Sequence, residues 1–423
     1  MKLFQLLVAA AVVAAPAFVR AEGALSLDQV QAEARAQAPE AAELAARIGG
    51  ARAVASDARR VLRNDPLLTA RYVTGALCGD AGETAWEVGA EWTIDISGSW
   101  APRRGAAEAD LDRATFDEAD GLRMLDEAVA FAVADLSFGQ RQVARLERIV
   151  ALQELSAAAA RKQLDAGQGT QLDVDSADLD WAAARQDLVI ARGDREQARV
   201  RLARLVGRVS GTGVVVEDPI ETKPLPARPD PAAMEGDDPR VRAAEADMRA
   251  ARLGLELDER LVWPAPTFGV DLGLARHEIP TGAFTGDPVL NAKWRDTELG
   301  VRVTLPFPLV DRRKEQRTRS SLRLGNAEAH LRTVRADVWG ERKGAWEALA
   351  AAAEAYQAVA GTAEIVDRDY DLLGKALRAG ALDVVVRAQS LRRLEEAGVR
   401  LDRALRDLRV ARARWARQAG ATR

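Results

Sequence analysis

The chain has 423 residues, of which 48% are hydrophobic and 29% charged, and this composition excludes intrinsic disorder, which requires low hydrophobicity and a high net charge. The formal net charge of -4 argues against a nucleic-acid-binding protein, which would be strongly basic. One cysteine, Cys78, and two histidines, His277 and His330, leave little material for a disulfide framework, a zinc site or a Ser-His-Asp triad. We therefore expect no enzyme, no metal site and no cofactor.

The first 21 residues have the pattern of a signal peptide. Lys2 supplies a positive start, residues 3–15 are apolar apart from one glutamine, and Val19-Arg20-Ala21 predicts cleavage before Glu22. The apolar stretch is shorter than the roughly 20 residues of a membrane-spanning helix, which disfavours an uncleaved inner-membrane anchor. No later stretch is apolar for long enough either, so a membrane span in the exported protein would have to be built from strands.

The rest of the chain reads as two weakly similar halves, residues 22–210 and 239–423, joined by a proline-rich linker at 211–238. The proline that opens an Ala-rich segment at Pro39 is repeated at Pro239. The proline before a strand region at Pro66 is repeated at Pro266, at the same offset. Each half is predicted to run helix, strand pair, long helix, tight turn, long helix.

Long helices are predicted on both sides of each turn. In the first half, residues 106–165 and 171–206 are rich in Ala, Leu, Arg, Glu and Asp, and Ser26 with Gln29 forms a capping box for the first helix. In the second half, apolar residues at spacings of three and four predict a helical seam, and one helical pattern runs from Leu309 towards Ala379. The seam residues are Val241, Ala244, Met248, Ala251 and Leu255.

Strand pairs are predicted near residues 67–97 and 266–306, where apolar and polar side chains alternate and so take opposite faces. The polar positions are candidates for the lining of a water-filled lumen: Glu87, Glu91, Asp95, Asp271, Glu298 and Arg302. Arg71 should face the same lumen. The apolar positions are candidates for a lipid face: Trp86, Trp92, Ile94, Phe268, Val301 and Val303. A half-exposed sheet of a soluble protein would alternate in the same way.

Four strands cannot close a membrane barrel, since the smallest barrels have about eight, and an open edge is not tolerated in lipid. If these strands span a membrane, several chains must pool them, and three chains would supply 12.

Four features of the sequence occur together: Leu25-Ser26-Leu27-Asp28, the proline before the first strand of each half, the two turns between long helices, and Leu305-Pro306-Phe307-Pro308-Leu309. In these features the chain resembles the TolC family of outer-membrane efflux proteins. The short chain and the segment from Leu305 to Arg312 are most similar to the heavy-metal efflux, CzcC-type branch. The turns supply the candidate tip and gate residues, which are Gly167, Thr170, Asp173 and Val174 in the first and Gly380 and Asp383 in the second.

The resemblance implies a mainly α fold with a transmembrane β-barrel: a homotrimer with 12 strands in the outer membrane and a long α-helical barrel in the periplasm. The chain would be a passive exit duct of a tripartite efflux system, with an inner-membrane pump and a periplasmic adaptor, the membrane fusion protein, as partners. The CzcC-type likeness implies metal cations as one class of cargo.

Two alternatives stay open. The acids near the tips, Asp173, Asp175, Asp178 and Asp383, could form a charged ring in an oligomer or could simply cap and solvate helices. The whole chain could instead be an exported periplasmic coiled-coil adaptor or structural protein, which would have no need of tryptophan-rich strand pairs.

Overall fold

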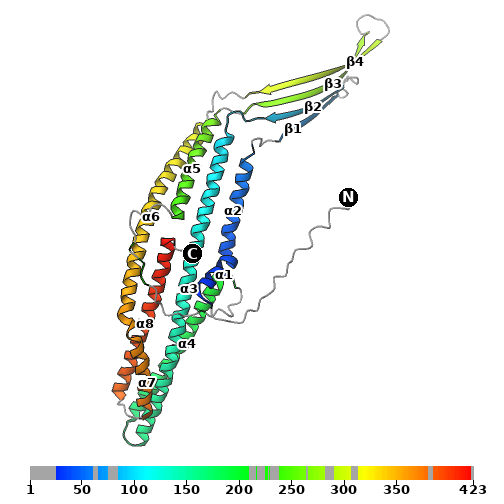
Figure 1. Cartoon of the computed structure of the whole chain (residues 1–423). Coiled ribbons are helices and arrows are strands. Elements are labelled where there is room, and N and C mark those ends of the chain that lie inside the picture. The colour runs from blue at the N-terminus through cyan, green and yellow to red at the C-terminus, as the bar shows by residue number, and fades with distance from the viewer. Residues whose placement is uncertain are drawn as a thin grey trace. The chain divides into compact units, whose positions relative to one another are not determined.

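The computed structural model describes residues 25–60, 65–74, 84–208, 216, 224–226, 228, 238–262, 265–281, 290–305, 313–379 and 384–420. The predicted signal peptide, most of the predicted linker, Cys78, Gly380 and Asp383 lie outside these ranges. The described residues form eight helices and four strands (Figure 1). Their bounds in the first half are α1 Leu27–Gln37, α2 Pro39–Ala58, β1 Leu67–Thr74, β2 Thr84–Thr93, α3 Trp100–Asp165 and α4 Gln171–Leu205. In the second half they are α5 Pro239–Arg260, β3 Thr267–Thr281, β4 Leu290–Thr304, α6 Lys314–Ala360, α7 Ala363–Ala379 and α8 Val384–Ala419.

The four strands form one antiparallel sheet in the order β1-β2-β3-β4 (Figure 1). The pairing between β2 and β3 joins the two predicted halves of the chain, with Trp86 opposite Leu274 and Glu91 opposite Gly269. Strands β1 and β4 are the edges of this sheet, so each has a row of main-chain groups that no other described strand pairs. Among the described residues, none of the helices combines the length and the hydropathy needed to cross a bilayer.

The chain divides into two compact units. The sheet unit contains residues 42–123, 228–344 and 418–423, and therefore all four strands. The hairpin unit contains residues 1–41, 124–227 and 345–417, and therefore the turn between α3 and α4. Helices α2, α3, α6 and α8 contribute residues to both units.

In the hairpin unit, helix α1 packs on α3 and α4 through a small apolar core. Val30, Leu136 and Leu202 are almost completely buried there, and alanines between them allow the helices to approach closely. The predicted capping box at the start of α1 is confirmed, because the Ser26 hydroxyl accepts a hydrogen bond from the Gln29 N–H and the Gln29 side chain accepts one from the Ser26 N–H.

In the sheet unit, the predicted seam of α5 packs against α6. Val241 and Ala244 are buried with Leu331 and Val338 in one cluster, and Met248 packs against it. The spacing of three and four along α5 therefore marks a buried helix face, as the sequence predicts.

The prediction of one continuous helix from Leu309 to Ala379 was wrong. Helix α6 begins at Lys314 and ends at Ala360, and α7 begins at Ala363. The break falls at Gly361 and Thr362, where the Thr362 hydroxyl donates to the Val359 carbonyl (2.7 Å) and the Thr362 carbonyl accepts from Val366 N (2.9 Å). A threonine that bonds to local main chain in this way starts a new helix more readily than it continues one.

Tyr370 offers a test of packing in the hairpin unit. It is 5% exposed, and its hydroxyl has no hydrogen-bond partner among the described residues. We expect Tyr370→Phe to change the free energy of unfolding by no more than about 1 kcal/mol, in either direction, because no bond is lost. Urea denaturation of the purified protein measures this, and a larger loss would mean that the hydroxyl is bonded.

The same burial raises the pKa of the Tyr370 phenol from 10.0 to about 12. Since the folded-state value is the higher one, the phenol supplies its full stability below pH 10 and loses it as the pH rises from 10 to 12. Tyr370→Phe should therefore flatten the pH dependence of stability in that interval.

Candidate functional site

The sheet has one charged face. Its strand register brings five of the six predicted lumen residues onto that face in adjacent rows, and Arg71 joins them, as predicted. The rows across β2, β3 and β4 are Glu91–Gly269–Arg302, Gly89–Asp271–Gly300 and Glu87–Gly273–Glu298. Charged residues and glycines thus alternate across the strands as well as along them.

Arg302 of β4 is the centre of the ion pairs on this charged face. Its guanidinium lies 3.3 Å from the Glu91 carboxylate of β2, 3.7 Å from Asp271 of β3 and 4.0 Å from Glu87 of β2. Arg71 of β1 lies 3.9 Å from the other oxygen of Glu87. Pairs of this kind on an exposed surface stabilise a sheet little, so their main effect is on the electrostatic potential of the face.

Two glycines make room for these long side chains. A Cβ atom on Gly300 would lie 2.0 Å from the Asp271 carboxylate, and one on Gly269 would lie 3.3 Å from the Glu91 side chain. Asp271 therefore extends over the neighbouring strand, and Arg302 and Glu91 meet across β3 because Gly269 has no side chain between them. The sequence predicts the alternation but gives no sign of this crossing.

The opposite, apolar face of the sheet is exposed in the single chain. Val301 is 75% exposed, Leu299 70% and Trp86 55%. The register aligns these residues in rows that run across all four strands, for example Leu68–Ala90–Val270–Val301, and the ring of Trp86 lies 4.6 Å from that of Tyr72. A contiguous apolar surface of this extent marks a contact with another protein or with lipid.

Two of the predicted strand residues lie beyond the strand. Strand β2 ends at Thr93, so Ile94 and Asp95 belong to the connection to α3, and neither takes part in the alternation of the sheet. Asp95 accepts hydrogen bonds from the Ser97 N–H (2.9 Å), the Ser97 hydroxyl (2.7 Å) and the Ser99 hydroxyl. This Asx turn folds the chain towards α3, so Asp95 is a turn residue beyond the strand and not part of its polar face.

The first hairpin tip is closed by Gly167. Gln168 N donates to the Gln163 carbonyl (2.8 Å) and Gly167 N to the Leu164 carbonyl (2.9 Å), with Gly167 at φ 70°. These two bonds and the left-handed residue between them form a Schellman motif, which ends α3 where the sequence places the turn.

Thr170 and Asp173 form a capping box at the start of α4. The Thr170 N–H and hydroxyl both donate to Asp173 (2.9 and 2.8 Å), and the Asp173 N–H donates back to the Thr170 hydroxyl. The bonds from Thr170 lower the pKa of the Asp173 carboxyl below its ordinary value of 3.8. Of the two interpretations of Asp173, the structure favours the helix cap.

The neighbouring tip acids are also paired. Asp178 accepts both of its hydrogen bonds from Arg161 (2.7 and 2.8 Å), and Asp175 accepts one from Gln171 (2.8 Å). Val174 is buried among Ala157, Ala160 and Ala177, where it joins the two helices of the hairpin. In the single chain, Asp173, Asp175 and Asp178 thus each accept a hydrogen bond from a neighbouring side chain.

Arg387 of α8 is not among the residues predicted from the sequence. It is 3% exposed and donates to the Ser156 carbonyl of α3 (3.3 Å), and its positive charge contributes to lowering the pKa of Asp173. This residue brings the start of α8 to the first hairpin. No local pattern marks it, because its partners are more than 200 positions away in the chain.

Gly167 should be the most sensitive glycine of the first tip. We expect Gly167→Ala to lower the free energy of unfolding by about 1–2 kcal/mol, since a left-handed conformation costs other residues this much and no atom obstructs the added methyl group. Gly193→Ala in α4 is the matched control: its methyl also meets nothing, but in a helix it should stabilise by up to about 1 kcal/mol. Chemical denaturation of both variants measures the difference, and equal effects would contradict the prediction.

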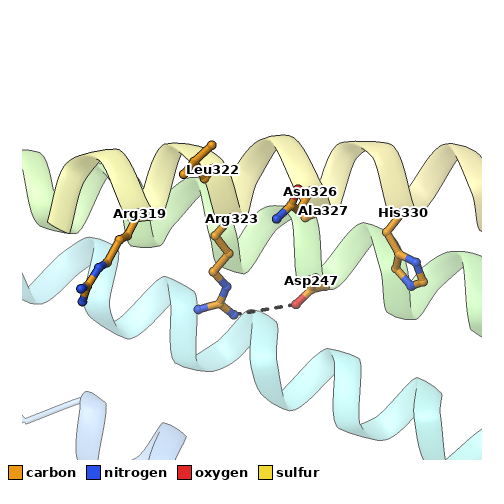
Figure 2. Close-up of a pocket in the computed structure, with 7 residues that line it drawn as sticks. All are labelled: Asp247, Arg319, Leu322, Arg323, Asn326, Ala327 and His330. Carbon is orange, nitrogen blue, oxygen red and sulfur yellow. Dashed lines mark ion pairs between the residues drawn. The ribbon is translucent and has the colours of Figure 1, made fainter. Parts of the chain in front are cut away.

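His330 lines a groove of about 410 Å³ between α5 and α6 in the sheet unit (Figure 2). Asp247 of α5 lies 3.8 Å from Arg323 of α6 there and also accepts a hydrogen bond from Arg113 of α3 (2.8 Å). Figure 2 shows Asn326 and Ala327 between Arg323 and His330 on α6. No group of three or more His, Cys, Asp or Glu residues in the described ranges is placed to hold a metal ion.

A family model and individual curated proteins both match part of the amino-acid sequence. The family model described as "Outer membrane efflux protein" matches residues 30–208. The nickel-cobalt-cadmium resistance protein NccC of Alcaligenes xylosoxydans xylosoxydans is 27% identical over 226 residues, which are 53% of this chain and 47% of NccC. The outer membrane efflux protein BepC of Brucella suis is 26% identical over 215 residues, 50% of this chain and 45% of BepC. The matched segments thus span about half the length of these curated relatives.

Solved structures match nearly the whole fold. The outer membrane protein VceC of Vibrio cholerae has a TM-score of 0.73 at 15% identity, covering 93% of this chain and 96% of its own. The open-state outer membrane channel MtrE of Neisseria gonorrhoeae has a TM-score of 0.72 at 17% identity, covering 93% and 88%. The fold is therefore that of these channels, mainly helical with a small sheet of two strand pairs. The sequence match to the outer membrane efflux protein family model covers residues 30–208, from within α1 to the end of α4, and the similarity of fold extends over both halves of the chain.

Proposed function

We propose that the chain is one protomer of a homotrimeric outer-membrane duct in a tripartite efflux system. In this assembly three sheets close a barrel of 12 strands in the outer membrane, and the long helices extend into the periplasm. The duct is passive, and an inner-membrane pump supplies the energy. The two-repeat organisation, residues 22–210 and 239–423 around a linker at 211–238, belongs to the same proposal.

The observation that carries this proposal is the two-faced sheet with open edges. One face is apolar and exposed, with Val301 at 75%, and the other is lined by charged residues and glycines. Such a sheet suits a boundary between lipid and water. Its edge strands, β1 and β4, require further strands before lipid can surround it, because unpaired main-chain groups are not tolerated there.

The proposed partners follow from the same arrangement. The tips at Gly167 and at Gly380 would meet a periplasmic adaptor, and Thr170, Asp173, Val174 and Asp383 belong to that surface. The capped start of α4 supports this role, since a rigid, bonded tip presents a fixed surface to a partner.

We further propose metal cations as one class of cargo. The support is the match to NccC, whose name states nickel, cobalt and cadmium resistance, together with the excess of carboxylates on the charged face of the sheet. A strain that lacks this chain should then become more sensitive to these cations than to hydrophobic drugs. The opposite order would remove cations from the proposal and leave the duct intact.

The location and the mass of the mature protein test the duct itself. Inner and outer membranes are separated on a sucrose gradient, and the protein is extracted in detergent and its mass measured by light scattering. We expect outer-membrane protein with the mass of three chains, each close to the 45.6 kDa of the full chain before cleavage. A soluble periplasmic monomer would overturn the proposal and favour the adaptor or structural protein.

A further inference from the structure

We propose that Arg302 sets the charge preference of the duct by neutralising part of a carboxylate cluster on the lumen side of the sheet. The inference rests on the proposed function, since it takes the charged face as the lumen. It assigns to Arg302 an influence on how readily cations pass through the duct compared with anions.

The charged face of the sheet has more carboxylates than guanidinium groups. Its described rows contain five carboxylates, Glu87, Glu91, Asp271, Asp296 and Glu298, and two guanidinium groups, Arg71 and Arg302. A lumen lined in this way attracts cations and repels anions. The preference therefore depends on how well the two arginines offset the carboxylates.

Arg302 contributes most of this offset. Its guanidinium lies within 4.0 Å of three carboxylates on two other strands, whereas among the described residues Arg71 lies within that distance of Glu87 alone, at 3.9 Å. Removing the Arg302 charge would leave Glu91 and Asp271 with no arginine in an ion pair with them among the described residues of the sheet. Because the side chain is about half exposed, the unscreened carboxylates would act on ions in the lumen.

The geometry that brings these groups together depends on glycine. Gly269 separates Arg302 from Glu91 on the intervening strand, and Gly300, two residues before Arg302, leaves space for the Asp271 carboxylate. The close packing of four charged side chains across three strands is thus built into the register of the sheet. It is not the chance contact of long side chains on a surface.

The test measures ion selectivity of the purified full-length protein in planar lipid bilayers. Reversal potentials in a KCl gradient give the permeability ratio of K⁺ to Cl⁻. We expect Arg302→Gln to raise this ratio by about twofold or more at 0.1 M salt and by less at 1 M, because the Debye length falls from about 10 Å to about 3 Å. Arg302→Lys, which keeps the charge, should remain close to the wild type, and Arg71→Gln should have a smaller effect than Arg302→Gln.

Arg295→Gln is the matched control, since it makes the same charge change on the same strand but on the opposite face, where Arg295 pairs with Arg276 of β3 in the register. It should leave the ratio unchanged. Equal ratios for Arg302→Gln and the wild type, or an equal shift in Arg295→Gln, would overturn the inference and leave the duct standing. Wild-type protein that forms no pores would overturn the duct, and the inference with it.

If Arg302→Gln does not assemble, the same permeability ratio is measured for a double variant. Glu91→Gln together with Arg302→Gln removes the closest ion pair and lessens the repulsion among the remaining carboxylates. The permeability ratio of K⁺ to Cl⁻ in this double variant should exceed the ratio in Glu91→Gln alone. Equal ratios in these two variants would show that the Arg302 charge has no influence on permeation.

Discussion

Arginine at Val301 or Val303 is expected to impair assembly in the membrane severely. Both side chains are on the apolar face of β4 and are 75% and 59% exposed in the single chain. An arginine on the lipid face of a membrane strand costs about 2–4 kcal/mol near the middle of the bilayer, and a trimer would carry that cost three times. Refolding into lipid vesicles, followed by the yield of detergent-resistant trimer, measures the effect.

Thr304→Arg is the control for this prediction. Thr304 lies on the same strand, in the row of Thr267 and Thr93 on the charged face, where the Thr93 and Thr267 hydroxyls lie 2.9 Å apart. An arginine there would face water, so assembly should be almost unchanged. Equal tolerance of arginine at all three positions would contradict the assignment of the two faces.

Asp238→Ala is expected to cause the largest loss of stability in the helical part of the sheet unit. Asp238 is 2% exposed, accepts the N-cap hydrogen bond from Arg240 N (2.9 Å), and lies 3.2 Å from the guanidinium of Arg342, which is itself 7% exposed. Removing one partner of a buried ion pair costs about 3–5 kcal/mol, because the other charge stays buried. Chemical denaturation followed by tryptophan fluorescence measures the loss.

The pH dependence of this cluster follows from the pKa of Asp238. Burial acts to raise the pKa of this carboxyl, but the hydrogen bonds and charges of Arg240 and Arg342 outweigh it and hold the pKa below the ordinary 3.8. A carboxyl with a lowered folded-state pKa supplies its stability above pH 3.8 and loses it as the pH falls through the folded-state value. Asp238→Ala should therefore reduce the acid sensitivity of the protein as well as its stability.

Glu396→Ala is the matched control for Asp238→Ala. Glu396 also pairs with an arginine, Arg400, at 2.9 Å, but both side chains are more than 60% exposed. Its loss should cost less than about 0.5 kcal/mol. A similar loss in both variants would mean that Asp238 is not the buried centre of its cluster.

The sequence by itself determined the features that depend on local periodicity. Alternation with a period of two identified the strands and both faces, spacings of three and four identified the seam of α5, and the residues Ser26 and Gln29 identified a helix start. The folded structure shows these patterns because each depends only on the geometry of a single helix or strand. The turn at Gly167 belongs to the same class, since a left-handed residue is needed to end a helix tightly.

Only the tertiary structure decided which polar groups meet. Arg302 and Glu91 lie 211 positions apart, and their contact depends on the register of three strands and on the missing side chain of Gly269. For Asp95, which the sequence placed on a strand, and Asp173, which it left open between a ring and a cap, the hydrogen bonds seen in the structure are instead local, to Ser97 and Thr170. An ion pair or a side-chain hydrogen bond forms over a few ångströms in space, and distance along the chain carries no information about it until the fold is known.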